Sequence, residues 1–256
     1  MAVISLDFYS KALKMSTTLT MVLPDSVRIG DTPVSDRNCL YLLHGLSDDS
    51  SSCLRLSKIE LYAQESGIVI VMPSAGRSMY CDNIYGQNYF SYIAHELPEY
   101  LNLIFGIKGD KNKTFIAGIS MGALGASRIA LTYPERFAAV GLFSGLLNLK
   151  LMLPVMSDEQ KNDFAYLLSE TKDIDNSGLN PINLLDPKKH SDIKFYIYCG
   201  RQDDLYPLTV TFLEKAVALG LNVVPCIEDG IHDWYFWDKH LQTFIADISV
   251  NAVGKA

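Results

Sequence analysis

The pentapeptide GISMG at positions 118–122 has the spacing of a serine nucleophile held on a sharp turn. In a G-x-S-x-G segment of this kind a strand turns directly into a helix, and the serine exposes its Oγ beside the helix N-terminus. The helix dipole favours the negative charge that develops on a carbonyl oxygen under attack. The apolar run Thr114–Ala117 precedes the motif, and the helix-forming run Ala123–Ala130 follows it. This context favours Ser120 as a catalytic nucleophile over a structural serine in a strand–helix turn.

A catalytic serine needs a histidine base, and three histidines follow Ser120 in the chain. His232 comes after a predicted strand and a short loop, directly before a predicted helix, where a neutral base at the sheet edge is expected. His190 lies in the polar stretch DPKKHS, for which we expect a solvated surface role, and His240 lies inside the last predicted helix. We therefore predict that His232 is the base. The aromatic run WYFW at 234–237 is predicted to be mostly core, with one ring facing the pocket as the alternative.

The base needs an orienting carboxylate, which in this type of triad follows a strand between the serine and the histidine. Asp203 and Asp204 both come shortly after the apolar run Lys194–Cys199. Spacing alone does not separate these two aspartates. Asp186 and Asp192 lie in the irregular segment before this run and are weaker candidates.

Two backbone amides are needed to hold the oxyanion. One is expected from Met121, the residue after the nucleophile, and the other from a loop that follows an early strand. The segment LLHGLS at 42–47 is such a loop, and Leu46 is the candidate for the second donor. His44 precedes the serine in the chain and sits in a turn, so we expect it to shape this loop rather than to act as the base.

Apolar runs of strand length alternate with helical patterns along the chain. The predicted strands are Ala2–Tyr9, Thr17–Leu23, Cys39–Leu43, Ile68–Met72, Lys113–Ala117, Phe137–Phe143, Lys194–Cys199 and Asn222–Ile227. The predicted helices are Ser57–Ser66, Tyr89–Phe105 with Pro98 as a start or kink, a run to about Thr132, a run near Thr209–Leu219, and Trp234–Ile248. Most of the strands are continuously apolar, which indicates an α/β fold with a mostly parallel sheet and helices on both faces. The first two strands alternate instead and predict an antiparallel opening pair.

The segment from Leu146 to Ser191 breaks this alternation, because its polarity is mixed and it contains no clear strand. We predict a single domain over residues 1–256, with a helical cap or lid inserted at about residues 146–191. Such an insertion would lie over the carboxyl ends of the strands, where ligands bind in open α/β sheets.

The composition of the 256 residues, with 48% hydrophobic and 20% charged side chains, excludes disordered, collagen-like and coiled-coil chains. The net charge of −7 argues against a nucleic-acid partner. The longest stretch without a charged residue, Thr114–Ser127, has 14 residues, whereas a membrane helix needs about 18 or more. Asp7 and Lys11 stand where a signal peptide would have its apolar core. We therefore expect neither a membrane span nor export by that route.

The five cysteines are odd in number and show no zinc-ligand spacing. Cys39 and Cys199 lie in apolar runs and are predicted to be buried thiols. Motifs for phosphate, dinucleotide or HExxH metal binding are absent from the sequence. We predict no cofactor, no metal and a reducing, cytoplasmic location.

Several segments together resemble the tributyrin esterases, which are bacterial α/β-hydrolases of the esterase D group, related to S-formylglutathione hydrolases and mycolyltransferases. These segments are LYLLHGLSDD (40–49), IVIVMPS (68–74), TFIAGISMGALGA (114–126), CGRQDDLY (199–206) and HDWYFW (232–237). The resemblance spans nearly the whole chain and is weakest over Leu149–Lys189, the expected cap. It implies the α/β-hydrolase fold and carboxylesterase activity on short-chain acyl esters.

The resemblance also implies roles for single residues. It makes Ser120 the nucleophile, His232 the base and Asp203 the acid, since the family's acid stands three residues after the glycine of its G-x-x-D. The backbone donors map to Leu46 and Met121. The chain departs from the family at Ala123, where a second glycine is frequent, and at Asp204, where several members have an aromatic residue.

The sequence therefore predicts a cytoplasmic serine carboxylesterase that hydrolyses small short-chain esters through an acyl-enzyme, with no cofactor. A second enzyme hypothesis keeps the triad but changes the substrate to a thioester such as S-formylglutathione, or to a feruloyl or acetyl group on sugar. A third hypothesis is a non-catalytic binding protein on the same fold. The oligomeric state is left open, with a homo-oligomer among the alternatives.

Overall fold

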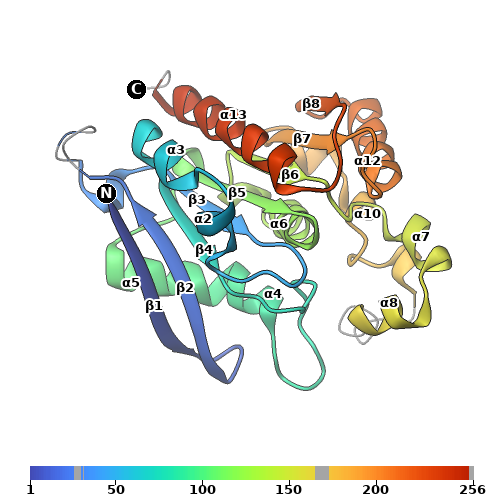
Figure 1. Cartoon of the computed structure of the whole chain (residues 1–256), viewed down its shortest axis with the longest axis horizontal. Helices are drawn as coiled ribbons and strands as arrows, with labels where there is room; N and C mark the ends of the chain where they lie inside the picture. Colours follow the sequence, from blue (N-terminus) through green and yellow to red (C-terminus); the bar gives the residue numbers. More distant parts are fainter. Residues whose placement is uncertain (26–29, 31, 165–172, 254–256) are drawn as a thin grey trace.

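The computed structural model describes residues 1–25, 30, 32–164 and 173–253. Eight strands in these residues form one sheet in the order β1-β2-β4-β3-β5-β6-β7-β8 (Figure 1). The strands are β1 (Ala2–Ser10), β2 (Met15–Leu23), β3 (Cys39–Leu43), β4 (Val69–Pro73), β5 (Thr114–Ile119), β6 (Ala139–Phe143), β7 (Lys194–Gly200) and β8 (Val223–Glu228). From β4 to β8 all neighbours are parallel. The predicted α/β class with a mostly parallel sheet is therefore confirmed.

The first two strands form the predicted antiparallel hairpin, with Ala2 opposite Leu23 and Ser10 opposite Met15. β2 then pairs antiparallel with β4 and joins the hairpin to the parallel part of the sheet. On β1, exposed and half-buried residues alternate, whereas every residue of β3 and β5 is buried. The difference follows from position, because a strand at the sheet edge has one solvated face and a central parallel strand has none.

The helices are α2 (Ser52–Leu56), α3 (Ile59–Ser66), α4 (Tyr89–Ser91), α5 (Leu97–Phe105), α6 (Met121–Thr132), α7 (Leu149–Met152), α8 (Asp158–Asp163), α10 (Pro181–Leu184), α11 (Pro187–His190), α12 (Tyr206–Ala218) and α13 (Trp234–Val253). Short 3₁₀ turns occupy η1 (Val34–Asp36), η3 (Lys111–Lys113), η4 (Pro134–Arg136), η5 (Leu153–Val155) and η6 (Ile174–Asn176), and η2 (Tyr92–Glu96) is a π-helical turn.

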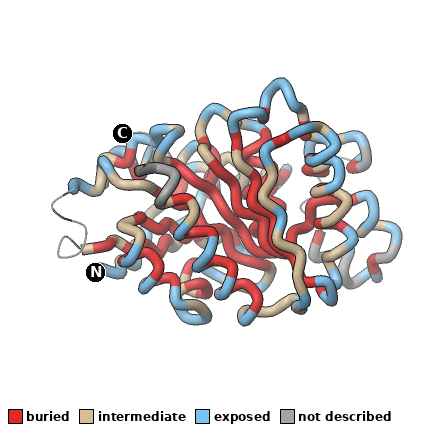
Figure 2. The backbone as a smooth tube through the Cα atoms, turned by 90° about the horizontal axis from the view of Figure 1, so that it is seen from above, coloured by how far each residue is buried: buried red, intermediate tan, exposed pale blue. Residues whose placement is uncertain are grey.

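Two helical layers cover the sheet and give it two apolar cores. On one face α3 and α13 lie side by side (Figure 1), and Ile59 and Phe244 pack with strand residues such as Leu40. On the other face α5, α6 and α12 pack against side chains that point the opposite way, such as Ile116. Figure 2 shows the buried strands running through the middle of the molecule, with exposed segments around them.

The predicted helix over Tyr89–Phe105 is present but is not a regular α-helix throughout. The π-helical turn η2 separates α4 from α5, which carries Pro98 in its first turn. Proline has no backbone N–H for the carbonyl four residues earlier and its ring crowds that carbonyl. This carbonyl is that of Ala94, and the Arg136 guanidinium donates to it instead.

The segment predicted as a cap contains only short helices and turns in its described residues, and no strand. Leu149 donates its N–H to Asn180 Oδ1 at 3.0 Å, which ties the beginning of the segment to its later part. Residues 165–172 lie outside the described residues, so a cap at about 146–191 within a single domain of 1–256 stays a prediction. No helix of the described chain combines the length and apolar character that crossing a membrane requires.

One prediction for this segment was wrong. His190 was expected to be solvated, but its side chain is fully buried. Its Nδ1 accepts the N–H of Asp186 at 3.0 Å, and its Nε2 is 2.9 Å from the carbonyl oxygen of Leu131 at the end of α6. The short helix α11 turns the ring inward although the surrounding sequence is polar.

Candidate active site

Ser120 lies at the turn between β5 and α6 in a backbone conformation that non-glycine residues rarely adopt, with φ 56° and ψ −113°. Its N–H donates to the carbonyl of Phe143 on the neighbouring strand at 2.8 Å, and its own carbonyl accepts the N–H of Ala123 at 3.0 Å. The side chain is half-buried. Strained residues of this kind persist where the surrounding structure holds them in place, and they cluster at functional sites.

The two glycines of the motif are required by close backbone approaches. A Cβ on Gly118 would lie 2.0 Å from the carbonyl oxygen of Gly122, and a Cβ on Gly122 would lie 2.1 Å from the carbonyl oxygen of Leu43. The first turn of α6 therefore packs directly on the ends of β5 and β3. This packing brings the loop after β3 beside the serine.

His232, in the loop between β8 and α13, connects the serine to a carboxylate. Its Nε2 is 3.1 Å from Ser120 Oγ, and its Nδ1 is 3.0 Å from both oxygens of Asp203. An ionised carboxylate can only accept hydrogen bonds, so Nδ1 carries the proton and Nε2 is the acceptor that faces the hydroxyl. The structure thus brings together three residues that lie 112 and 29 positions apart in the chain.

Asp203 is buried, and its neighbour Asp204 is exposed. Burial opposes ionisation of Asp203 and is the largest single effect. Hydrogen bonds from His232, from the Ser144 hydroxyl and from the Leu205 N–H together outweigh it and lower the pKa of the carboxyl. The Leu205 amide donates at 2.8 Å. Asp203 therefore stays a carboxylate and can hold the imidazole of His232 in one tautomer.

Leu46 and Met121, the predicted amide donors, flank the serine. Met121 is the first residue of α6, and Leu46 follows Gly45, whose added Cβ would lie 3.7 Å from Ser120 Cβ. In the described part of the chain neither amide donates to a protein acceptor. Both N–H groups are therefore available for a ligand oxygen.

His44 shapes this loop, as predicted. Its buried ring donates from Nδ1 to the carbonyl of Gly45 at 2.7 Å and accepts the Ala75 N–H at Nε2 at 2.9 Å. Burial lowers the pKa of His44, although the Gly45 carbonyl and the carboxylates of Asp48 and Asp49 act in the opposite direction. The ring stays neutral, and each of its two nitrogens is hydrogen-bonded to a backbone group.

Two further side chains lie beside the candidate triad, and the sequence had pointed to only one of them, as part of the aromatic run at 234–237. Ser144 follows β6 with a φ of 50° and is fully buried. Its Oγ accepts the indole N–H of Trp237 at 3.0 Å, and the Trp237 ring meets the His232 ring edge-to-face at 4.8 Å between centroids. Trp237 belongs to the aromatic run at 234–237, for which one ring facing the pocket was the alternative prediction. The only sequence feature that could have indicated Ser144 is the serine–glycine pair that it forms with Gly145, directly after an apolar strand.

Among the described residues, one cluster could be considered for a metal ion. Ligand atoms of Cys226, Glu228 and His240 lie within 4.8 Å of one another. His240 turns Nδ1 toward Cys226 Sγ at 3.8 Å and Nε2 toward Glu228 at 3.1 Å, so a single ion could take only one of its nitrogens. Lys239 also pairs with Glu228. The cluster lies on β8 and α13 and includes none of the triad residues. Cys39 and Cys199 are buried free thiols, as predicted.

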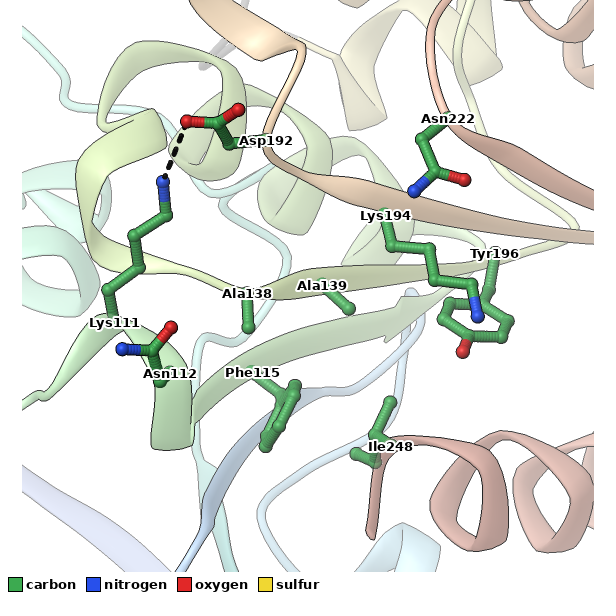
Figure 3. Close-up of a pocket in the computed structure, with 10 residues that line it drawn as sticks. All are labelled: Lys111, Asn112, Phe115, Ala138, Ala139, Asp192, Lys194, Tyr196, Asn222 and Ile248. Carbon is green, nitrogen blue, oxygen red and sulfur yellow. Dashed lines mark ion pairs between the residues drawn. The ribbon is translucent and has the colours of Figure 1, made fainter. Parts of the chain in front are cut away.

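A cavity of about 430 Å³ lies at the opposite end of the sheet, around the beginnings of β5, β6 and β7 (Figure 3). Lys111 and Asp192 form an ion pair at its rim, with 3.8 Å between Nζ and Oδ2. Its lining contains no serine, cysteine or histidine. It therefore contains no serine–histidine or cysteine–histidine pair for acyl transfer.

Comparison with known proteins places the chain among ester hydrolases. A model of the Esterase family, described as "Putative esterase", matches residues 10–248. An acetyl esterase of Caldicellulosiruptor saccharolyticus is 29% identical over 258 residues, covering 94% of this chain and 96% of that protein.

Two solved structures from Staphylococcus aureus are similar over almost the whole chain. The fluorophosphonate-binding serine hydrolase FphF is 30% identical with a TM-score of 0.86, covering 97% of this chain and 98% of that one. The S-formylglutathione hydrolase FrmB is 31% identical with a TM-score of 0.83 and the same two coverages.

Proposed function

The chain belongs to the Esterase family and is a carboxylic ester hydrolase of the α/β-hydrolase fold, and from this premise we propose that it works through a Ser120–His232–Asp203 triad. The observation that carries the proposal is the continuous contact from Ser120 Oγ through both nitrogens of His232 to Asp203. The strained backbone at Ser120 and the lowered pKa of Asp203 support the same assignment.

In the proposed mechanism, His232 Nε2 removes the hydroxyl proton of Ser120 while Oγ attacks the ester carbonyl carbon. The amides of Leu46 and Met121 donate to the oxyanion that forms. The C–O bond to the alcohol then breaks, and His232 returns its proton to the leaving oxygen. Water, deprotonated by the same imidazole, hydrolyses the acyl-enzyme and releases the acid and free serine.

The substrate class that we propose is a short-chain acyl ester, with the tributyrin type as the reference. The similarity to an acetyl esterase supports a small acyl group. A thioester of the S-formylglutathione type is the second candidate, favoured by the similarity to FrmB. A feruloyl or acetyl ester of a sugar remains a third candidate. A cytoplasmic location stays a prediction from the sequence.

Labelling with a fluorophosphonate probe tests the nucleophile. Wild type is expected to take up one probe per chain on Ser120, as located by peptide mass spectrometry, because only a serine with an adjacent base reacts. Ser120→Ala should take up none. Ser127→Ala is the matched control, since this buried serine of α6 bonds the Leu124 carbonyl and does not contact the triad. Labelling that persists in folded Ser120→Ala would overturn the assignment.

A substrate panel then separates the candidate substrate classes. p-Nitrophenyl esters of increasing acyl length, glutathione thioesters and acetylated sugars should be compared by kcat/KM on the same enzyme preparation. We expect the short p-nitrophenyl esters to lead. A glutathione thioester that exceeds them by tenfold or more would favour the second candidate.

A further inference from the structure

Trp237 contacts the triad in two different ways. It lies in the first turn of α13 with 6% of its surface exposed. Its ring packs edge-to-face against the imidazole of His232, with an interplanar angle of 90°. Its indole N–H points to Ser144 Oγ at 3.0 Å. One side chain therefore contacts the base and the end of β6 at once.

The direction of the hydrogen bonds can be derived from the groups involved. An indole N–H only donates, so Ser144 Oγ is the acceptor in that bond and its own proton is free for another partner. Ionised Asp203 only accepts hydrogen bonds, and the Ser144 hydroxyl lowers the pKa of its carboxyl by stabilising the charged form. The Cys199 thiol also faces Ser144, but sulfur is a weak acceptor beside a carboxylate. Trp237 therefore donates to Ser144, whose own hydroxyl proton stabilises the Asp203 carboxylate.

Ser144 is held in place independently of Trp237. Its N–H donates to the carbonyl of Tyr198 on β7 at 2.8 Å. The next residue, Gly145, exchanges two hydrogen bonds with Thr209 Oγ1 on α12, both at 3.1 Å. The φ of 50° at Ser144 is a conformation that needs such support. The hydroxyl is thus fixed relative to β7, at whose end the Asp203 turn begins.

These four side chains form a loop of interactions. Trp237 packs on His232 and donates to Ser144, His232 contacts Asp203, and the Ser144 hydroxyl stabilises the Asp203 carboxylate, which lowers its pKa. We propose that Trp237 and Ser144 are positioning residues that hold the imidazole of His232 and the carboxylate of Asp203 in one relative orientation. This inference rests on the proposed triad. Without these interactions, the Asp203 carboxylate is less stabilised and the His232 imidazole loses its aromatic packing partner. His232 is then aligned with Ser120 for a smaller fraction of the time.

The test compares two substitutions that remove different links of the loop. Trp237→Phe keeps an aromatic ring beside His232 but removes the indole N–H. Ser144→Gly removes the hydroxyl and suits the positive φ. Tyr62→Phe is the matched control, because it removes a hydrogen bond of 3.0 Å to Asp238 that docks α13 on α3 without contacting the triad. For each variant kcat and KM are measured with p-nitrophenyl acetate, together with thermal unfolding.

Each loop variant is expected to lower kcat about tenfold or more while KM stays within about twofold, since a small misplacement of catalytic groups can cost about 100-fold. The kcat of the double variant should lie within about twofold of the kcat of the more impaired single variant, because both substitutions disrupt the same set of interactions. Tyr62→Phe should keep the wild-type kcat. The split between kcat and KM shows that substrate binding is unaffected, and thermal unfolding identifies any variant in which general loss of structure lowers the active fraction.

Folded loop variants with a kcat within twofold of wild type would overturn the inference, as would single effects that multiply in the double variant. Ser144→Gly alone decides the matter if Trp237→Phe does not fold. Failure of the triad itself gives a different result, because Ser120→Ala would then keep its activity or wild type would hydrolyse no ester.

Discussion

The carbonyl oxygen of Gly122 lies 2.0 Å from the position that a Cβ on Gly118 would occupy. Real side chains do not tolerate this separation, so the strand before the serine and the helix after it can approach each other only with glycine at position 118. This approach in turn forces the chain through the strained conformation at Ser120. The glycine spacing in the motif is thus a consequence of how the serine is presented.

The first prediction concerns this contact. Gly118→Ala should destabilise the fold by more than about 3 kcal/mol, beyond the usual range of overpacking, because the clash is with backbone atoms that cannot rotate away. Gly178→Ala is the matched control, since its added Cβ would lie 3.6 Å from Leu184 Cδ2, an ordinary contact. Urea unfolding measures both variants. An unchanged midpoint for Gly118→Ala would contradict the account of the elbow.

The fold could be predicted largely from the sequence because the central strands are buried on both faces. Continuous apolar runs such as Cys39–Leu43 have no solvated side, and the strand observed there has the same limits. The predicted helix near Thr209–Leu219 begins earlier, at Tyr206, because Pro207 fits the first helical turn and not its interior. Element ends of this kind depend on capping contacts that periodicity does not reveal.

The candidate site was less predictable where it depends on tertiary contacts. The motif and the order of residues indicated Ser120 and His232, but spacing could not show that Asp203 turns inward while Asp204 remains exposed. His190 was misplaced because a four-residue helix buries a ring that the polar sequence around it would leave in water. Ser144 was missed because no motif marks it, and only its contact with Trp237, 93 residues away, shows that it lies beside the site.

Ser120→Ala should remove nearly all ester hydrolysis, with a loss of kcat on the order of 10⁶, as for triad nucleophiles generally. The fold should be retained, because alanine keeps the Cβ and the backbone contacts of Ser120 do not use its hydroxyl. Circular dichroism and thermal unfolding provide the control. A folded variant that keeps more than about one hundredth of the wild-type rate would show that another residue is the nucleophile.

Stability should fall on mild acidification, partly through His44. Burial lowers the pKa of this ring in the folded state, whereas an unfolded histidine titrates near about 6.5. Above this pH both states are neutral and the contribution of His44 to stability is complete. As the pH falls below it, the unfolded chain binds a proton that the folded ring resists, and stability is lost toward the lower, folded pKa.

The measurement is the free energy of unfolding at pH 7.5 and pH 5.5. His44→Gln should show a smaller loss between the two pH values than wild type, whatever its absolute stability. His95→Gln is the control, because His95 is exposed and bonds only the Tyr133 hydroxyl among described residues. An equal loss in wild type and His44→Gln would remove His44 as a cause.

Acyl chains of two to four carbons should be preferred over chains of eight or more. The expectation comes from the family resemblance, and the similarity to an acetyl esterase supports it. The kcat/KM values of p-nitrophenyl esters test this. A steady rise to twelve carbons would indicate a long acyl pocket instead.

The last prediction separates the two adjacent aspartates. Asp203 holds His232 Nδ1 at 3.0 Å and is buried, whereas the Asp204 side chain lies in solvent. An asparagine at position 203 could offer its N–H₂ to the imidazole and so favour the tautomer with a proton on Nε2, which cannot accept from Ser120. The corresponding change in a serine protease cost about 10⁴ in kcat, and we expect Asp203→Asn to lose several orders of magnitude in kcat.

Asp204→Asn is the matched control, with the same chemical change one residue later. Its kcat should stay within about tenfold of wild type, because an exposed charge has only a small electrostatic effect on the base. Both are measured as kcat on the same short ester, with thermal unfolding to verify the fold. A severe defect in Asp204→Asn beside a mild one in Asp203→Asn would reverse the assignment of the acid.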